Sequence, residues 1–286
     1  MPENTLPKLV IFGNPKKEHV VEAINEFSSF AKGKAQILAN CSIGDCPFKI
    51  LEGADFAVVF GGDGSIISAA RNLSCCKVPI IGINLGKLGF LAEFSIAEFK
   101  ELFNEIVSGK AVIEKRMMLG CQVLTGGKQK FSSAAINDVF ITAGPPFRTI
   151  ELNISVDGQS LAGCVGDGLI ISTPTGSTAY NLSAGGPILS SKMKAMVITP
   201  ICPHSLSFRP IVINADSIVE VSGVRVNEGT TISIDGQISL PLSINDAAKI
   251  TRYQDDFFIV NNPLRTQWDT LGNKLRWAEK PKYNIV

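Results

Sequence analysis

The 286-residue chain has few of the residues that build metal centres and disulfide frameworks. It contains two histidines and seven cysteines, and no two cysteines have the Cys-x-x-Cys spacing. An odd number of cysteines in a chain of this length argues against a disulfide framework, and two histidines give a zinc site little support. We therefore expect no protein-built metal site, and reduced cysteines, mostly buried as small hydrophobic side chains, in a cytoplasmic protein.

Neither sign of charge is in excess, because 27 Lys and Arg residues oppose 26 Asp and Glu residues. Proteins that neutralise nucleic-acid phosphates normally carry a basic excess, so we expect no nucleic-acid partner. No apolar run approaches the length of about 18 residues that spans a membrane, and the N-terminus lacks the basic and apolar regions of a secretory signal. We therefore expect no membrane association. Hydrophobic residues make up 45% of the chain, which is ample for a core.

The first part of the chain alternates strand and helix patterns. Short apolar runs suit buried strands, the segments between them carry apolar residues at helical spacing, and Ser95 with Glu98 forms a capping-box pattern. The expected strands are 8–12, 36–38, 56–60 and 79–83, and the expected helices are 17–30, 66–71 and 95–109. This alternation predicts an α/β domain over residues 1–112, with a Rossmann-like, mostly parallel sheet covered by helices.

The rest of the chain has a different texture. Short β-branched runs replace helical spacing, and Asp157-Gly158 and Asp235-Gly236 each stand between strand-like residues, which is a strong hairpin signal. We expect an antiparallel all-β domain of sandwich type over residues 113–264, with 257–260 as a strand near its end. Helical spacing returns after it, and predicts a C-terminal tail over 265–286 that packs back onto the body.

A glycine-rich turn, Gly61-Gly62-Asp63-Gly64-Ser65, lies between a predicted strand and a predicted helix. Glycines let backbone N–H groups approach a ligand closely, and a helix N-terminus favours an anion such as phosphate. A carboxylate would repel phosphate, so Asp63 indicates a different role, in which it accepts a proton from a hydroxyl or holds a metal. The alternative is a tight connection in which Asp63 caps the helix.

Three further polar groups are candidates for nucleotide binding. The segment 173–187, TPTGSTAYNLSAGGP, can present hydroxyls and N–H groups to ribose or phosphate, with Tyr180 available to stack on a base. Asn137 and Asp138 can read an adenine edge and a pair of ribose hydroxyls, and Arg148 can meet a phosphate. The structural alternatives are, in turn, a loop that caps a short helix, a strand-end turn and a solvated cation.

Together these residues resemble the NAD kinase family of bacterial type, over nearly the whole chain. The motifs that carry the resemblance are GGDGS at 61–65, Asn137-Asp138, DGLI at 167–170 running into 173–187, TPICPHSLSFRP at 199–210, and Asp235-Gly236-Gln237. GGDG alone also occurs in lipid kinases and phosphofructokinases, but its combination with TPTGSTAY and SAGGP is highly specific. The resemblance implies that ATP phosphorylates the adenosine ribose 2′-hydroxyl of NAD, giving NADP. It also implies a divalent cation such as Mg²⁺, an active site between the two domains, and a homo-oligomer, either dimer or tetramer.

The resemblance also assigns roles to residues. Asp63 would be the catalytic general base, and Mg²⁺ would be held mainly by ATP phosphates and water. Phosphate, adenosine and the dinucleotide cleft would be contacted by Gly62, Gly64, Ser65, Asn137, Asp138, Arg148, Asp167, Thr178, Ala179, Tyr180, Asn181, Ser183 and Gln237. Arg148 would contact a pyrophosphate, from a neighbouring subunit in one arrangement. Val165 stands where many members have Arg, so it is left out of the site, and Asp138 stands where Glu is common.

Two other functions share part of this pattern. A lipid kinase of the diacylglycerol or sphingosine type would have the GGDG turn and a two-domain layout, but it needs a deep apolar acceptor pocket that no stretch of the sequence marks. A dinucleotide-binding regulator would keep the cleft without turnover, but binding alone gains nothing from a carboxylate at position 63.

Overall fold

The computed structural model describes residues 6–86 and 88–277, which form two compact units. One unit combines residues 1–115 with 257–286, and the other spans 116–256. Within the described residues, no helix is both long and apolar enough to cross a membrane. Each unit has its own core, so each is described by itself.

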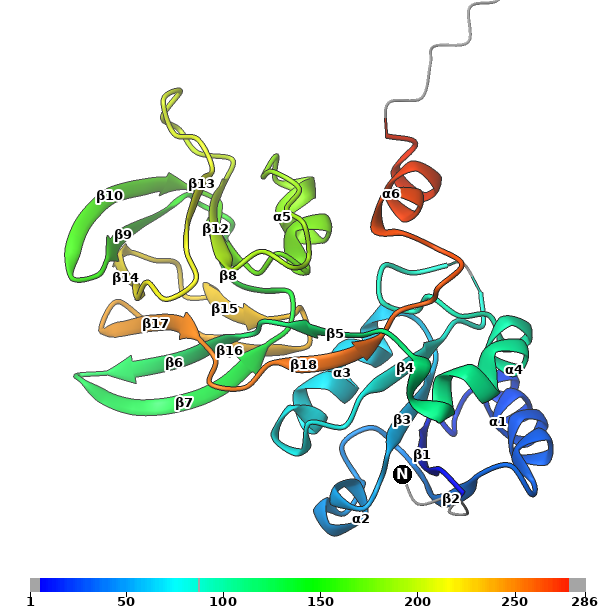
Figure 1. The fold of residues 1–286 in the computed structure, drawn as a ribbon. Coiled ribbons are helices and arrows are strands. Elements are labelled where there is room, and N and C mark those ends of the chain that lie inside the picture. Colours follow the sequence, from blue (N-terminus) through cyan, green and yellow to red (C-terminus); the bar gives the residue numbers. More distant parts are fainter. Residues whose placement is uncertain (1–5, 87, 278–286) are drawn as a thin grey trace, which may run out of the picture. The chain divides into compact units, whose positions relative to one another are not determined.

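The first unit is a mostly parallel sheet with helices packed against it, as the alternating sequence pattern predicts (Figure 1). The strand order is β2-β1-β3-β4-β18-β5. The strands are β1 (Lys8–Phe12), β2 (Gln36–Cys41), β3 (Phe56–Phe60), β4 (Ile80–Ile83), β5 (Ile113–Arg116) and β18 (Phe257–Val260). The helical segments are α1 (Glu18–Ala31), α2 (Phe48–Glu52), α3 (Asp63–Leu73), η1 (Ser74–Cys76), α4 (Ile96–Glu105), η2 (Ile106–Lys110) and α6 (Gln267–Leu275).

Aromatic side chains join α1 and α4 on one side of this sheet. Phe27 lies 5.0 Å from Phe99 and 6.1 Å from Phe103 between ring centroids, and all three are buried. Helix α3 packs instead against β3, β4 and β18. The β1–α1–β2 and β3–α3–β4 connections run in opposite directions along the sheet, so right-handed crossovers place α1 and α3 on opposite faces. Figure 1 shows this arrangement.

The strand order reverses between β1 and β3, and this topological switch point positions the glycine-rich turn. β2 lies on the outer side of β1, and β4 lies on the outer side of β3. In open α/β sheets, ligands bind beyond the carboxyl ends of the strands at such a point. The turn 61–65 directly follows β3, and the segment 13–17 directly follows β1, so the fold brings both segments to this position.

Strand β18 corrects the sequence prediction for residues 257–260. The run follows the antiparallel strands along the chain, and we therefore expected it among them. It pairs in parallel with β4 instead, through Ile259 and Ile80. The sequence FFIV is compatible with this position, because three of its four residues are buried, as in a parallel strand covered on both faces.

The second unit consists of two antiparallel sheets around a shared core, as the sequence predicts. One sheet has the order β10-β9-β14-β17-β6-β7, and the other has the order β13-β12-β11-β8-β15-β16. The strands are β6 (Leu119–Thr125), β7 (Lys128–Ala135), β8 (Asp138–Thr142), β9 (Ile150–Val156), β10 (Gln159–Gly166), β11 (Gly168–Ser172), β12 (Ala195–Ile201), β13 (Ile211–Asn214), β14 (Val219–Arg225), β15 (Thr231–Ile234), β16 (Ile238–Pro241) and β17 (Asp246–Arg252). Two short helices, η3 (Gly176–Thr178) and α5 (Tyr180–Ser183), follow β11.

Both predicted hairpins are confirmed. Asp157 and Gly158 have φ values of 52° and 76° between β9 and β10, and Asp235 and Gly236 have 52° and 64° between β15 and β16. Two successive residues with positive φ are the signature of the type I′ turn, which matches the twist of the flanking strands.

The seven cysteines lie in different surroundings, and most of them are not buried. Cys121 and Cys164 lie in the core of the second unit, and burial raises the pKa of Cys121 to about 12. Of the other five, Cys41 ends β2, Cys46 and Cys202 lie in connecting segments, and Cys75 and Cys76 belong to η1; all five side chains are at least partly open to solvent. The expectation that most would be buried is therefore wrong.

Candidate functional site

Two cavities lie beside the glycine-rich turn of the first unit. One has a volume of about 440 Å³, and its lining includes Asn14, Lys16, Asp45 and Ser65. The other has a volume of about 270 Å³, and Lys17 and Ser65 are among its lining residues. Both therefore combine cationic side chains with the turn that precedes α3, at the position where this fold class binds ligands.

The backbone geometry of the turn requires glycine at its start. Gly61 has φ of 151°, and a Cβ there would lie 2.4 Å from the Ser65 hydroxyl oxygen. Gly62 is the N-cap of α3, and the Ser65 backbone N–H donates to its carbonyl oxygen at 2.9 Å. Gly62, Gly64 and Ser65, the residues expected to contact phosphate, all line one or both cavities.

Asp63 is not the cap of its own helix. It is the first residue of α3, and no side chain caps the helix at Gly62. Its carboxylate accepts hydrogen bonds from the backbone N–H groups of Phe90, Leu91 and Ala92, at 2.9, 2.9 and 3.0 Å. The carboxylate is therefore oriented by a segment that follows β4, and its side chain remains 29% exposed.

Two other residues adjoin this carboxylate. A Cβ atom on Gly89 would lie 1.9 Å from Oδ1 of Asp63, so the carboxylate occupies the space that any larger residue would need. The Lys274 ammonium, from α6, lies 3.8 Å from Oδ2 of Asp63.

In the second unit, strand register brings distant motifs to one end of a sheet. Asp138, which begins β8, pairs with Ser172, which ends β11, and the next residue, Val139, pairs with Ile234, which ends β15. Because these strands are antiparallel, the segments 136–138, 173–183 and 235–237 all gather at this end. The clustering of Asn137, Asp138 and the 173–187 loop therefore follows from the sheet itself.

Asp235 organises the start of β8. Its carboxylate accepts hydrogen bonds from the backbone N–H groups of Ile136, Asn137 and Asp138, with the shortest, from Asn137, at 2.7 Å. The Asn137 carbonyl in turn accepts from the Thr173 N–H at 2.8 Å. The backbone of Asn137 is thus fixed from both sides.

Asp138 is the most strongly perturbed carboxyl group of this region. It is 3% exposed, and burial, followed by the negative charge of Asp235, raises its pKa to about 7. Residues 138, 140 and 142 point away from the core, because Val139 and Ile141 between them are core residues. The Asp138 side chain therefore lies on the same face of the sheet as Phe140.

Tyr180 covers part of this face. Its ring meets Phe140 edge to face, with a centroid separation of 5.0 Å, and the side chain keeps 36% of its surface exposed. Burial raises the pKa of Tyr180, and the charges of Cys202, Asp138 and Asp167 raise it further. The phenol thus stays protonated, near two carboxylates, and can donate a hydrogen bond to a ligand.

Asn181 holds the loop together through its side chain. Its amide donates to the carbonyls of Ser177 and Pro187 at 3.1 and 3.0 Å and accepts from the Thr199 hydroxyl at 2.6 Å. The residue is fully buried, and a Cβ on Gly186 would lie 2.0 Å from its Oδ1 atom. The side chain is used internally, which agrees with an expected contribution through the backbone.

The other predicted residues have less constrained positions. Arg148, Asp167, Ser183 and Gln237 are all exposed, and the hydroxyl of Thr178 donates to the Thr175 carbonyl at 3.4 Å. Ala179 precedes α5, and its N–H donates to the Gly176 carbonyl at 2.8 Å. The expected binding roles of these residues remain predictions.

Comparisons with known proteins agree with these motifs. Residues 10–111 match the ATP-NAD kinase N-terminal domain, and residues 136–261 match the ATP-NAD kinase C-terminal domain. The NAD kinase of Thiobacillus denitrificans is 38% identical over 289 residues, which cover 98% of this chain and 99% of that protein. This chain belongs to the NAD kinase family.

Two solved structures have a similar fold. Yeast NADH kinase, crystallised with NADH, gives a TM-score of 0.87 at 26% identity, and the match covers 98% of this chain and 90% of that one. An NAD kinase from Archaeoglobus fulgidus, crystallised with ATP, gives a TM-score of 0.76 at 24% identity, covering 95% of this chain and 99% of that one. Membership of the NAD kinase family decides against the lipid-kinase alternative.

Several residues beside the expected NAD kinase site were missed by sequence reasoning. They are Asn14, Lys16, Lys17, Asp45, Gly89, Asp235 and Lys274. One sequence signal could have identified Asn14, Lys16 and Lys17. In a doubly wound sheet, residues directly after β1 lie at the same switch point as those directly after β3. No local pattern points to Gly89 or Lys274, because both meet Asp63 only through the tertiary fold.

Proposed function

We propose that the chain transfers the γ-phosphoryl group of ATP to the 2′-hydroxyl of the adenosine ribose of NAD, with Asp63 as general base. As a member of the NAD kinase family, it is an ATP-dependent NAD kinase that gives NADP. The observation that carries the role of Asp63 is its orientation by three backbone N–H groups outside its own helix. A general base must be held within hydrogen-bond reach of the hydroxyl that it deprotonates.

The acceptor side of the proposal rests on the second unit. Asn137 and Asp138 would bind the adenosine moiety, and Tyr180 would contact the dinucleotide beside them. Support comes from the fixed backbone of Asn137, the buried Asp138 carboxyl group on the same sheet face as Phe140, and the exposed part of the Tyr180 side chain. Thr178, Ser183, Asp167 and Gln237 would line the rest of the cleft.

The donor side rests on the two cavities of the first unit. Lys16 and Lys17 line them together with Gly62, Gly64 and Ser65, so the cavities offer positive charge and small residues to phosphate groups. The Archaeoglobus fulgidus NAD kinase was crystallised with ATP, which is consistent with donor binding by this fold.

We further propose that Mg²⁺ accompanies the donor. Among residues 6–86 and 88–277, no three His, Cys, Asp or Glu side chains gather as a metal-binding set. Asp45, Ser42 and Ser65 are nevertheless among the residues that line the larger cavity. Mg²⁺ commonly takes one or two carboxylates and completes its shell with water and substrate phosphates, so this sparse oxygen set fits the ion. When bound, the cation would neutralise charge on the transferred phosphoryl group.

The last part of the proposal concerns the oligomeric state of the enzyme, its cellular compartment and the role of Arg148. We place the enzyme in the cytoplasm, with its cysteines reduced, and propose a homo-oligomer, either dimer or tetramer. Arg148 lies exposed in the segment between β8 and β9, and we propose that its guanidinium contacts a pyrophosphate, of its own or a neighbouring subunit's ligand. Loss of NAD affinity in Arg148→Ala, with unchanged ATP affinity, would support that contact.

A donor and acceptor assay tests the proposed reaction. The purified chain is incubated with Mg²⁺, ATP and either NAD, NADH or diacylglycerol, and the position of the new phosphate is determined by NMR. We expect phosphate on the adenosine ribose 2′-oxygen of the dinucleotide and none on the lipid. Phosphorylation at another hydroxyl, or tight NAD binding without turnover, would overturn the proposal.

A further inference from the structure

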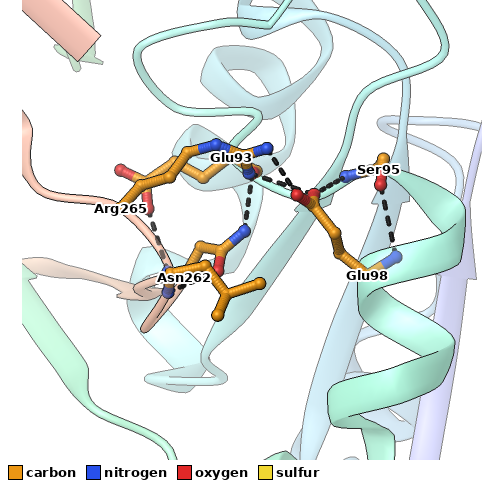
Figure 2. A network of polar contacts seen from close by, with 6 residues as sticks. Glu93, Ser95, Glu98, Asn262 and Arg265 are labelled. Carbon is orange, nitrogen blue, oxygen red and sulfur yellow. Dashed lines mark hydrogen bonds and ion pairs between the residues drawn. The ribbon is translucent and has the colours of Figure 1, made fainter. Parts of the chain in front are cut away.

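The chain after β18 is hydrogen-bonded to the segment that directly follows residues 90–92, whose N–H groups bind the Asp63 carboxylate. The Asn262 backbone N–H donates to the Glu93 carboxylate at 3.0 Å, and its side-chain amide donates to the Glu93 carbonyl at 3.0 Å. The Arg265 guanidinium donates to that same carbonyl and to both carboxylate oxygens of Glu98 (Figure 2). Residues 262–265 are therefore bound to Glu93, which directly follows the segment that holds Asp63, and to the first turn of α4.

The ion pair between Arg265 and Glu98 stabilises the ionised form of the Glu98 carboxylate. Burial alone would raise the pKa of Glu98, but hydrogen bonds from Arg265 and from the Ser95 backbone outweigh burial and lower it. Figure 2 shows Glu98 between Arg265 and Ser95, where it closes the capping box of α4. One carboxylate thus fixes both the start of α4 and the C-terminal segment.

Helix α6 starts directly after Thr266, the residue that follows Arg265. Thr266 and Asp269 form a second capping box, and Leu271 is buried at 5% exposure. These contacts set the position of the last turn, which carries Lys274. We call residues 262–275 the C-terminal strap.

The strap brings the Lys274 ammonium to Asp63. Its Nζ atom lies 3.8 Å from Oδ2 of Asp63 and 4.6 Å from the centre of the Phe90 ring. A carboxylate has about four acceptor positions, and backbone N–H groups occupy three of them here. Oδ2 accepts one of those three bonds, so the ammonium stands beside the oxygen that keeps a free acceptor position.

We propose that Lys274 is a positioning residue and counter-ion for Asp63, delivered by the C-terminal strap. The inference rests on the proposed role of Asp63 as general base. In this role the ammonium would balance the charge of the carboxylate when the donor's phosphate groups enter the cavities beside the glycine-rich turn, and it would fix the orientation of Oδ2. An ion pair with side chains about 30% exposed contributes little to folding, so stability alone does not account for it.

A double-mutant comparison tests this inference. NADP formation is measured at saturating ATP and NAD for the wild type, Lys274→Ala, Asp63→Asn and the double variant. We expect Lys274→Ala to lower kcat about tenfold with KM for NAD within about twofold, because positioning of the base acts in the transition state. When Asp63 is already replaced by Asn, adding Lys274→Ala should alter kcat less than about twofold, because the carboxylate that Lys274 positions is no longer there.

Two further variants separate this role from a loss of structure. Lys274→Arg keeps the positive charge, and a guanidinium can also lie over the Phe90 ring, so this variant should recover at least about half of the lost turnover. Asn273→Ala changes the neighbouring exposed residue of α6 and should match the wild type. Arg265→Ala should lower kcat in the same direction as Lys274→Ala, because it releases the strap.

The outcomes for the two proposals are distinguishable. Asp63→Asn alone decides whether Asp63 is the base. An unchanged kcat in Lys274→Ala would overturn the inference about Lys274, and so would an equal fold-loss in both backgrounds, or a failure of Lys274→Arg to recover activity.

Discussion

A Cβ atom at Gly89 would lie 1.9 Å from the Oδ1 atom of Asp63, a separation that real atoms do not reach. The carboxylate therefore fits against the backbone of the loop whose next three residues hold it by their N–H groups. Only glycine at position 89 leaves room for the Asp63 carboxylate where it lies.

This contact predicts the effect of a single methyl group. Gly89→Ala should displace the Asp63 carboxylate and lower kcat at least about tenfold, whereas strain of about 1–3 kcal/mol would leave the protein folded. NADP formation and thermal unfolding measure the two effects. Gly53→Ala is the matched control, because its Cβ would meet nothing closer than 3.6 Å. Full activity in Gly89→Ala would mean that the observed position of Asp63 is not required for turnover.

A second prediction concerns Asp138 and the pH dependence of stability. Its pKa is raised to about 7 by burial and by Asp235, whereas in the unfolded chain the group titrates near its ordinary value of about 3.9. Between these values the folded state keeps a proton that the unfolded state has lost. The contribution of protonated Asp138 to the free energy of unfolding is therefore fully present below about pH 3.9, the pKa of the group in the unfolded chain. It is lost as pH rises toward about 7, the pKa in the folded protein. Asp138→Asn cannot ionise, so its melting temperature should fall less than that of the wild type between about pH 4 and pH 7.

The same substitution should weaken acceptor binding. An ionised Asp138 accepts charge-assisted hydrogen bonds from ribose hydroxyls, so NAD affinity of the wild type should increase as pH rises through about 7. Asp138→Asn should lose about 1.5–3 kcal/mol of NAD binding above that pH and show no such increase, with ATP binding little changed. Calorimetric titration with each ligand measures this. Equal losses for NAD and ATP would point to misfolding or to another role for Asp138.

A further prediction concerns the buried amide of Asn181. Asn181→Ala removes three hydrogen bonds and leaves the Thr199 hydroxyl and two carbonyls without this partner. We expect a loss of about 3 kcal/mol in the free energy of unfolding, together with weaker NAD binding, because the loop that carries Tyr180 loses its internal support. Urea unfolding measures the stability, and Asn153→Ala, an exposed residue of β9, serves as control. A change below about 0.5 kcal/mol would show that the loop is held by other contacts.

The sequence predicts most elements because their apolar spacing is local information. The strand pattern of β3, the capping box at Ser95 and the paired Asp-Gly turns all depend on neighbouring residues, and the structure has them where expected. The prediction for β18 is wrong about its sheet because periodicity identifies a strand but not its neighbours. The parallel pairing of β18 with β4 joins residues far apart in the chain.

For the candidate site too, the sequence identifies the residues of the motifs but not the distant residues that hold them in place. The glycine-rich turn identifies Asp63, but not the residues 27 to 29 positions away whose N–H groups bind its carboxylate. Asp235 is predicted as part of a hairpin, and the turn is confirmed, yet its carboxylate also fixes the backbone of Asn137, 98 positions away. Such contacts depend on which strands become neighbours, and a single sequence does not state that.

The role of Asp63 as general base is tested most directly by turnover of Asp63→Asn at saturating ATP and NAD, with NAD affinity measured separately by calorimetry. The amide keeps the shape of the side chain and removes its basicity, and a positioned general base contributes about 10²–10⁴-fold to rate. The general-base role predicts that kcat falls at least about a hundredfold, that NAD affinity changes only modestly, and that the protein stays folded. A variant that keeps half of the wild-type turnover would contradict it.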